Sequence, residues 1–447
     1  MIDIEIGQIG QTITGKTPSS KFPEDFGEEY MFITPSDNFD DKTIYRTNRY
    51  LSENGLNKLK NKILPPKSVL VSCIGSAMGK VTINNSTAIT NQQINSIIVN
   101  SNYYDSDYIY YQLKNNYKLL RTAALGSTAL PMLNKTEFDK LKLSIHKNLV
   151  CQKKIAKVLS DLDAKIEINN KINQELEAMA KTLYDYWFVQ FDFPVALATS
   201  SELDSEPLTS GNSKPYKSSG GKMVFNDELK REIPVGWESG TFDTISTITG
   251  GSTPSKAIIE NFTKENNTSW ITPKDLSQNK GKKFITRGEW DVTNIGIKSA
   301  SLKLMPKGTV LLSSRAPIGY LAISRQEVTT NQGFKSFVPK ENYSSEFIYY
   351  SVKNQIPKIE AYSSGSTFKE VSTSTLRTLM ISIPNENVLE EYYKISKPIF
   401  KKQNLLELEN QKLSELRDWL LPMLMNGQIT VGGAEKAVSS LRGTKQS

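Results

Sequence analysis

The segment Ile33-Thr34-Pro35-Ser36-Asp37 recurs as Ile271-Thr272-Pro273-Lys274-Asp275, displaced along the chain by 238 residues (271 − 33 = 238). Other short matches recur in the same order at almost the same separation, and chance similarity does not hold register in this way. They are Thr17-Pro18 with Thr253-Pro254, Pro66-Lys67 with Pro306-Lys307, Gly79 with Gly319, Thr90-Asn91-Gln92 with Thr330-Asn331-Gln332, Ile109-Tyr110-Tyr111 with Ile348-Tyr349-Tyr350, and Gly126-Ser127-Thr128 with Gly365-Ser366-Thr367. The chain therefore contains two copies of one module.

Each module is predicted to be mixed α and β. Short apolar runs such as Ser68 to Cys73 and Thr309 to Leu312 indicate strands, and clusters of Gly, Asn, Ser and Pro separate them. Most of the shared Gly, Pro and Thr positions indicate turns that need special backbone angles. A chain of 447 residues also favours two or more domains over a single core.

A long helical pattern follows each module. The first runs from about Leu149 to Phe188 without Pro or Gly, whereas the second contains Pro398, which predicts a late start or a kink. Alternate steps of three and four residues predict a heptad seam in both helices. Its apolar members are Ile155, Val158, Leu162, Ile172, Leu176, Met179 and Leu183 in the first helix, and Ile395, Ile399, Leu406, Leu413, Leu416 and Leu420 in the second.

The length of these helices favours a partner beyond their own domains. About 38 helical residues at 1.5 Å each span roughly 57 Å, more than the diameter of a small domain. The alternative is that each apolar stripe packs only against its own module. Since the first helix leads from module to module and the second can return, we expect an antiparallel pair with the modules at opposite ends. Such a rod suits two DNA half-sites about one turn of duplex apart.

Composition narrows the function classes. A net charge of +8, a pI near 9.0 and the basic cluster Lys280 to Lys283 favour a polyanionic partner, with a merely basic soluble protein as the alternative. His146 is the sole histidine, which argues against a Ser-His-Asp hydrolase or a His-rich metal centre. Cys73 and Cys151 have no metal-ligand spacing and favour a reducing compartment. The sequence has no long apolar run or signal pattern, so we expect a cytoplasmic protein.

One motif points to nucleotide binding instead. Residues 10–17 match the phosphate-binding pattern G-x-x-x-x-G-K-[ST] letter for letter. That mechanism needs a helix directly after the loop, and Pro18 and Pro23 oppose one. In the second copy Ser252 stands where Lys16 does, while the neighbouring glycine and Thr253 persist. We therefore interpret the shared element as a turn.

The loops carry the candidate DNA-binding residues. A Gly-Ser-Thr loop offers backbone N–H groups and hydroxyls to phosphate oxygens, and Arg, Lys, Asn and Gln side chains can read base edges. The candidates are Lys80, Asn91, Gln92, Gly126, Ser127 and Thr128 in the first copy, and Arg315, Asn331, Gln332, Gly365, Ser366 and Thr367 in the second. We expect neither catalytic residues nor metal ligands in this chain.

The ends of the helices resemble those of the specificity (S) subunit of Type I restriction-modification systems, and the resemblance covers nearly the whole chain. Leu183 to Phe188 followed by Phe191-Asp192-Phe193-Pro194 is similar to the central conserved region of that family. The distal conserved region is similar to Leu416-Arg417-Asp418, Leu420-Leu421-Pro422 and Leu424 to Gly427. Ile233-Pro234 with Gly236-Trp237 resembles the opening of a target recognition domain, which the first module lacks because it begins at Met1.

The resemblance implies a division of labour between subunits. Each recognition domain would read one half of a bipartite, asymmetric target in double-stranded DNA, while the helices set the spacer and dock two methylation subunits. Motor/restriction subunits would join for cleavage. S-adenosylmethionine, ATP and Mg would be bound by the partners and no cofactor by this chain, which has neither an Asn/Asp-Pro-Pro-Tyr/Phe motif nor a G-x-G-x-x-G fingerprint. The alternative is a coiled-coil interaction scaffold without sequence-specific DNA binding.

The expected fold class is α+β, with two repeated mixed α/β target recognition domains separated by two long antiparallel coiled-coil helices in pseudo-two-fold symmetry. The predicted boundaries place the first target recognition domain at 1–148 and the central conserved helix at 149–194. A flexible linker at 195–222 precedes the second recognition domain at 223–386. The distal conserved helix follows at 387–429, and a loose tail at 430–447.

Overall fold

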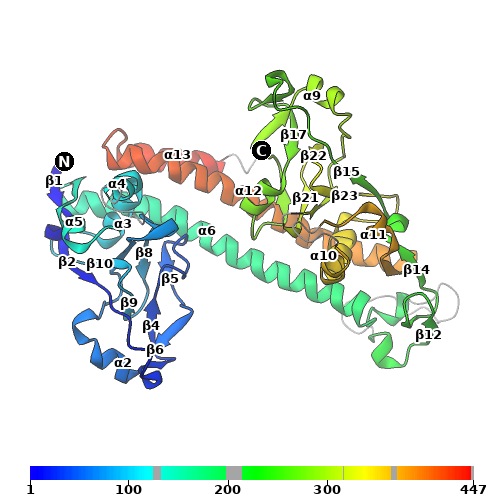
Figure 1. The fold of residues 1–447 in the computed structure, drawn as a ribbon, viewed down its shortest axis with the longest axis horizontal. Coiled ribbons are helices and arrows are strands. Elements are labelled where there is room, and N and C mark those ends of the chain that lie inside the picture. The colour runs from blue at the N-terminus through cyan, green and yellow to red at the C-terminus, as the bar shows by residue number, and fades with distance from the viewer. Residues whose placement is uncertain (124–131, 198–213, 316, 364–369, 444–447) are drawn as a thin grey trace. The chain divides into compact units, whose positions relative to one another are not determined.

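The computed structural model describes residues 1–123, 132–197, 214–315, 317–363 and 370–443 (Figure 1). The chain divides into two compact units: unit 1 comprises Met1–Ile168 with Asn410–Ser447, and unit 2 comprises Asn169–Glu409. Two long helices, α6 (Leu149–Tyr184) and α12 (Glu386–Met425), are shared between the units. The start of α6 and the end of α12 belong to unit 1, and the end of α6 and the start of α12 belong to unit 2. Part of the predicted linker, residues 198–213, lies outside the described residues.

Unit 1 contains a central five-stranded sheet, a four-stranded sheet and a pair of strands. The central sheet has the order β2 (Gly10–Thr14), β10 (Ile94–Val99), β7 (Val69–Ser72), β8 (Val81–Asn84), β5 (Thr43–Ile44). The four-stranded sheet has the order β3 (Phe26–Gly27), β6 (Arg49–Leu51), β4 (Tyr30–Ile33), β9 (Ala88–Thr90). The remaining elements are β1 (Ile2–Glu5) paired with β11 (Lys142–Ile145), and the helices α1 (Ile6–Ile9), α2 (Glu53–Lys58), α3 (Ser106–Asn115), α4 (Tyr117–Ala123) and α5 (Lys135–Lys140).

Unit 2 repeats this topology, which confirms the predicted duplication. Its five-stranded sheet has the order β15 (Ser246–Gly250), β23 (Phe334–Pro339), β20 (Val310–Ser314), β21 (Ile318–Ser324), β18 (Phe284–Ile285). Its four-stranded sheet has the order β16 (Phe262–Thr263), β19 (Trp290–Val292), β17 (Thr268–Ile271), β22 (Val328–Thr330). The remaining elements are β12 (Met223–Asn226) paired with β13 (Arg231–Pro234), β14 (Glu238–Thr241) paired with β24 (Met380–Ile383), and the helices α7 (Phe242–Ile245), α8 (Pro273–Gln278), α9 (Asn294–Ser299), α10 (Ser345–Ala361) and α11 (Thr373–Thr378).

The central strands β7 and β20 are buried along their whole length because both faces of the central sheet are covered. Successive side chains of a strand point to opposite faces. In β7, Val69 and Val71 join the cluster formed with α3 and α6, whereas Leu70 joins a cluster with Met31 and Ile33 of β4. In β20 the same alternation places Val310 and Leu312 in one cluster and Leu311 in the other. The helical layer therefore covers one face, and residues of the four-stranded sheet cover the other.

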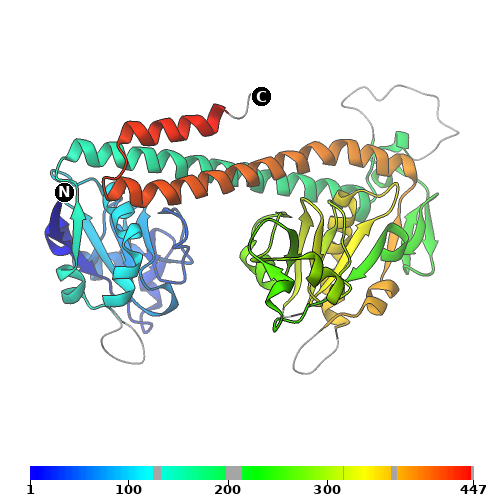
Figure 2. The same cartoon turned by 90° about the horizontal axis from the view of Figure 1, so that it is seen from above.

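In unit 1 the beginning of α6 packs against the end of α12, so the two helices run antiparallel there (Figures 1 and 2). Ile155, Val158 and Leu162 are buried in one cluster with Leu420, and Leu413 and Leu416 lie partly buried against it. An ion pair joins the same two segments, with Arg417 Nη1 2.7 Å from Asp163 Oδ1. The α6 and α12 segments of unit 1 thus behave as the heptad pattern predicts.

In unit 2 the end of α6 packs against the beginning of α12, again in antiparallel orientation. Ala180 and Tyr184 share a buried cluster with Leu389, Tyr392 and Phe400. Leu183 and Ile399 lie partly buried against that cluster, Leu406 is buried and Leu176 is half-buried. The prediction is wrong for three seam members, because Ile172, Met179 and Ile395 are 39%, 57% and 45% exposed. A strict 3.5-residue repeat drifts around a helix that has 3.6 residues per turn, so the buried face moves away from these positions.

Two further expectations about the second half of the chain are corrected. Pro398 neither delays nor ends the second helix, since α12 begins at Glu386 and continues to Met425. The tail after Ile429 is not loose over its described part, because residues Val431–Gly443 form α13. Gly427 has φ +69° and allows the chain to turn after α12, and the buried side chain of Ala434 attaches α13 to the unit 1 core.

We expect Arg417→Met to destabilise unit 1, because it leaves the carboxylate of Asp163 without its cation. The pair is 17% and 11% exposed, so its loss should cost about 2 kcal/mol, between the values for buried and surface pairs. The measurement is hydrogen exchange of the β7 amides under increasing denaturant. Lys157→Met removes a far more exposed pair with Asp161 on the same helix and serves as the control. Equal effects of the two substitutions would contradict a special role for Arg417.

Candidate nucleic-acid interface

The predicted site residues that the structure describes gather at one edge of the central sheet in each unit, which we call the loop edge. They are Lys80, Asn91 and Gln92 in unit 1, and Arg315, Asn331 and Gln332 in unit 2. In unit 1, antiparallel pairing places the ends of β2 and β7 beside the starts of β10 and β8. The loops that follow Thr14 and Ser72 and precede Ile94 and Val81 therefore meet. In unit 2 the corresponding ends of β15 and β20 lie beside the starts of β23 and β21.

Two backbone segments touch at the loop edge of each unit. The amide of Lys16 donates to the Thr90 carbonyl at 2.9 Å, and the amide of Ser252 donates to the Thr330 carbonyl at 3.0 Å. A Cβ at Gly15 would lie 2.1 Å from the Thr90 carbonyl oxygen, and a Cβ at Gly251 would lie 2.3 Å from the Thr330 carbonyl oxygen, so only glycine allows this approach. The match to the phosphate-binding pattern thus ends in β2 and a loop, with no helix directly after it.

The contact carries a repeated pair of polar side chains. Thr17 Oγ1 donates to Gln92 Oε1 at 2.7 Å, and Thr253 Oγ1 donates to Gln332 Oε1 in the same way. Both glutamines are exposed. Because the threonine hydroxyl fixes the amide oxygen, the two N–H donors of each glutamine point away from it and can meet an acceptor on a ligand.

The two candidate asparagines have internal partners instead. Asn91 Oδ1 accepts the amide of Gln93 at 3.1 Å, and Asn331 Oδ1 accepts the amide of Gly333 at 2.9 Å. These bonds close tight turns before β10 and β23. The side chains therefore hold the adjacent glutamines in place, and base reading by Asn91 or Asn331 would require breaking a turn.

The two candidate cations lie at the loop edges and are paired. Lys80 Nζ is 2.6 Å from Asp40 Oδ1, and Arg315 Nη1 is 3.5 Å from Glu370 Oε2. The Gly-Ser-Thr candidates, residues 126–128 and 365–367, lie outside the described residues. The described residues that follow these segments reach the loop edge, since Met132 forms a backbone bridge with Ile74 and Glu370 forms one with Arg315.

A pair of aspartates supports the loop edge and was not among the predicted site residues. Asp37 is buried and accepts the amides of Thr34 at 2.7 Å and Asn48 at 2.8 Å. Asp275 does the same with Thr272 and Glu289, at 2.7 and 2.8 Å. The repeated Ile-Thr-Pro-x-Asp motif contained this signal, because a shared acidic residue after a turn is a common acceptor for backbone N–H groups.

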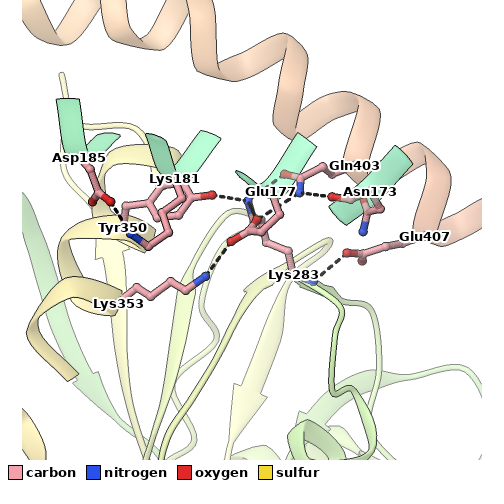
Figure 3. Close-up of polar contacts among 9 residues, drawn as sticks. All are labelled: Asn173, Glu177, Lys181, Asp185, Lys283, Tyr350, Lys353, Gln403 and Glu407. Atoms are coloured by element: carbon pink, nitrogen blue, oxygen red, sulfur yellow. Dashed lines mark hydrogen bonds and ion pairs between the residues drawn. The ribbon is translucent and has the colours of Figure 1, made fainter. Parts of the chain in front are cut away.

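A buried lysine joins the sheet of unit 2 to both long helices (Figure 3). Lys283 Nζ lies 2.6 Å from Glu177 Oε2 of α6 and donates to Gln403 Oε1 of α12 at 2.8 Å and to Tyr350 OH at 3.1 Å. Lys283 is 4% exposed. The interpretation of Lys280 to Lys283 as a cluster facing DNA is therefore wrong for Lys283, because three partners hold its ammonium group inside unit 2.

The charges of this Lys283 network depend on one another. Burial lowers the pKa of Lys283 to about 8, although the charge of Glu177 acts in the opposite direction. Burial alone would raise the pKa of Glu177, but the charge and hydrogen bonds of Lys283 and Lys353 lower that pKa to about 2. The backbone amide of Lys283 also donates to Glu407 Oε1 of α12 at 2.7 Å. Both helices thus hold the start of β18.

Unit 1 has an equivalent lysine with different partners. Lys42 immediately precedes β5, as Lys283 precedes β18, and its Nζ lies 2.6 Å from Asp107 Oδ1. It also donates to Ser160 Oγ of α6 at 2.6 Å. The conserved geometry of these lysines positions each sheet on its helices, whereas the acidic partners differ between the units.

Comparison with known proteins identifies the family. The sequence profile described as the Type I restriction modification DNA specificity domain matches residues 2–178 and 234–418. The chain belongs to this family. Its fold is similar to a crystal structure of the Type-I restriction-modification system S subunit from M. genitalium, with a TM-score of 0.58 and 13% identity over 95% of this chain and 96% of that chain.

Two curated relatives show the sequence similarity within the specificity family. The chain is 39% identical over 211 residues to the Type I restriction enzyme MjaIX specificity subunit of Methanocaldococcus jannaschii, covering 46% of this chain. That match spans about half of the relative, 48% of its length. The chain is 29% identical over 315 residues to the HindI specificity subunit of Haemophilus influenzae, covering 62% of this chain and 67% of the relative.

The described residues contain no cluster of three or more His, Cys, Asp or Glu side chains placed to hold a metal ion. Within the same part of the chain, no helix combines the length and the apolar character needed to cross a lipid bilayer.

We expect Glu177→Gln to destabilise unit 2 by an amount that depends on pH. The pKa of Glu177 is lower in the folded than in the unfolded chain, so its charge stabilises the fold fully above pH 4.5 and this contribution is lost as pH falls towards 2. After allowance for solvent screening we expect a difference of about 2 kcal/mol at neutral pH.

Denaturant unfolding at several pH values, followed by hydrogen exchange in β20, measures this difference. Asp161→Asn removes a carboxylate of a more exposed pair in unit 1 and is the control. A difference between Glu177→Gln and the unsubstituted chain that stays constant down to pH 2 would contradict the assignment.

Proposed function

We propose that this chain is the DNA sequence-specificity subunit of a Type I restriction-modification complex. Each unit reads one half of a bipartite, asymmetric target in double-stranded DNA through its loop edge. The observation that carries the proposal is the duplicated loop edge, in which the Thr17–Gln92 and Thr253–Gln332 pairs present amide donors in the same way. The net charge of +8 and membership of the DNA specificity family support DNA as the ligand.

The long helices set the spacer between the half-sites. α6 has 36 residues and α12 has 40, which correspond to about 54 and 60 Å of helix. The register of their antiparallel contacts is the same in both units. In unit 1, Asp163 of α6 pairs with Arg417 of α12. In unit 2, Glu177 lies 14 residues after Asp163, and its partner Gln403 lies 14 residues before Arg417. Continuous helices of these lengths suit an unread gap of constant size.

The same helices dock two methylation subunits. Ile172 and Met179 lie seven residues apart on one face of α6 and are 39% and 57% exposed, and Trp419 of α12 is 49% exposed. Apolar side chains on a charged helix surface favour a protein partner.

The subunit itself is non-catalytic and acts in the cytoplasm. S-adenosylmethionine, ATP and Mg are bound by the methylation and motor/restriction subunits, which perform methyl transfer and cleavage. What supports this division is the role of the two loop edges, whose repeated polar pairs suit recognition and supply no nucleophile with an adjacent base.

Replacement of residues 223–386 by the corresponding residues of another family member should change only one half of the methylated DNA motif. The reason is that this segment contains the loop edge of unit 2 and none of the unit 1 strands. The measurement is the genomic methylation motif in cells that contain the chain with its methylation partner. A change in both halves would contradict one reader per half-site.

An interaction scaffold that binds only protein is the alternative function. The complex with methylation subunits should bind a target duplex at least about 10³-fold more tightly than a scrambled duplex, and increasing salt should weaken binding to both. Equal affinity for the two duplexes over the whole salt range would favour the scaffold.

A further inference from the structure

Because the chain contains two readers, one can be compared with the other position by position. This comparison rests on the proposed function. If the halves of the target differ, a side chain present at the same place in both readers cannot by itself distinguish them. The Thr17–Gln92 and Thr253–Gln332 pairs are such shared features and suit the phosphate backbone, which is the same at both half-sites. Base preference must come from positions where the loop edges differ.

One position combines identical backbone geometry with opposite chemistry. The segment that starts at Met132 runs antiparallel to the residues after β7, where Ile74 bridges Met132 and the Leu133 amide donates to the Cys73 carbonyl at 3.1 Å. In unit 2, Arg315 bridges Glu370, and the Val371 amide donates to the Ser314 carbonyl at 3.0 Å. We call Ile74/Met132 and Arg315/Glu370 the bridge pairs.

The unit 1 bridge pair is apolar and accessible. Met132 is 54% exposed, and Ile74 is half-buried beside it. Beneath the pair lies the neutral Asn95, which is buried and donates through Nδ2 to the Leu133 carbonyl at 3.1 Å. Neither side chain of this pair carries a charge or a hydrogen-bond donor, so the pair can recognise a base only through apolar contact. The apolar group that the major groove offers is the C5-methyl group of thymine.

The unit 2 bridge pair is charged and held in place. Arg315 Nη1 lies 3.5 Å from Glu370 Oε2, and Lys335 Nζ lies 3.7 Å from Glu370 Oε1. Lys335 occupies the place on β23 that Asn95 occupies on β10, since each is the second residue of its strand and pairs with the third residue of the neighbouring strand. The Glu370 carboxylate therefore orients the Arg315 guanidinium through Nη1 and leaves the other N–H donors of the guanidinium available. A guanidinium fork matches the O6 and N7 acceptors of guanine.

We propose that the bridge pairs determine base preference, with Ile74/Met132 reading a thymine methyl group in one half-site and Arg315, oriented by Glu370, reading guanine in the other. The shared threonine–glutamine pairs bind phosphates in both half-sites. Specificity at these positions thus differs between the readers while the framework that supports it is the same.

The test exchanges the bridge pairs without changing the net charge. Arg315→Ile with Glu370→Met removes one cation and one anion, and Ile74→Arg with Met132→Glu adds one of each. Each variant is produced as the full chain with its methylation subunits, and long-read sequencing of the host genome gives the methylated motif. For Arg315→Ile with Glu370→Met we expect preference for guanine at one position of one half-site to fall about tenfold, with the other half unchanged.

The reverse exchange has its own expected result. Ile74→Arg with Met132→Glu should replace thymine by guanine at one position of the opposite half-site. In competition binding, the salt dependence of affinity should be unchanged for both exchanges because their net charge is unchanged. Gln92→Ala is the matched control, and it should lower methylation at all sites to a similar extent without altering the motif.

The outcomes separate this proposal from the proposed function. A complex of the unsubstituted chain that methylates no bipartite motif would refute the function, whereas an unchanged motif in an active Arg315→Ile, Glu370→Met complex would refute only the bridge-pair assignment. A change in both half-sites would also refute it. Should the double variant fail to fold, Arg315→Lys keeps the charge but removes the planar fork, and an unchanged motif in that variant overturns the assignment.

Discussion

The loop edges depend on a close backbone approach that only glycine permits. A Cβ would lie 2.1 Å from the Thr90 carbonyl oxygen at Gly15 and 2.3 Å from the Thr330 carbonyl oxygen at Gly251. Because glycine has no side chain, the residue that follows each glycine can donate its amide to this carbonyl oxygen. That contact brings a threonine hydroxyl to the exposed glutamine. The position of the glutamine amide therefore follows from the absence of one methyl group, and it does so twice in the chain.

Strong periodic signals in the sequence predicted the duplication, the mixed α/β class and the two long helices. The strand order was not predictable, because strands of two residues such as β5 and β18 carry no periodicity. The shared glycines were interpreted as turns, which is right for Gly79, with φ +82°, whereas Gly319, with φ +101°, lies in β21 where the register with β20 shifts. Gly15 and Gly251 are shared for a different reason, the contact with a distant strand, and no local pattern reveals such a contact.

The heptad seam of the long helices and the basic cluster Lys280 to Lys283 show where a sequence pattern fails to predict the environment of a side chain. Heptad steps assume a single partner along the whole helix, yet each long helix packs against both its neighbour and a sheet, so Met179 is exposed where the pattern expected burial. Lys283 looked like a surface charge because it follows Lys280 and Lys282. Its true environment depends on Glu177 and Gln403, which lie more than 100 residues away in sequence.

Unit 1 combines two segments that are far apart in the sequence, and this affects its folding during synthesis. Its core contains Leu420, Leu421, Leu424, Met425 and Ala434, while the other buried residues of that core come from the first part of the chain. A ribosome makes the amino-terminal portion first, so the apolar surface that these residues later cover stays open until the end of α12 and α13 have been synthesised. Unit 2, whose residues are contiguous from Asn169 to Glu409, meets no such delay. A nascent chain that stops early would expose that surface to chaperones and proteases, which gives the cell a means of removing incomplete readers.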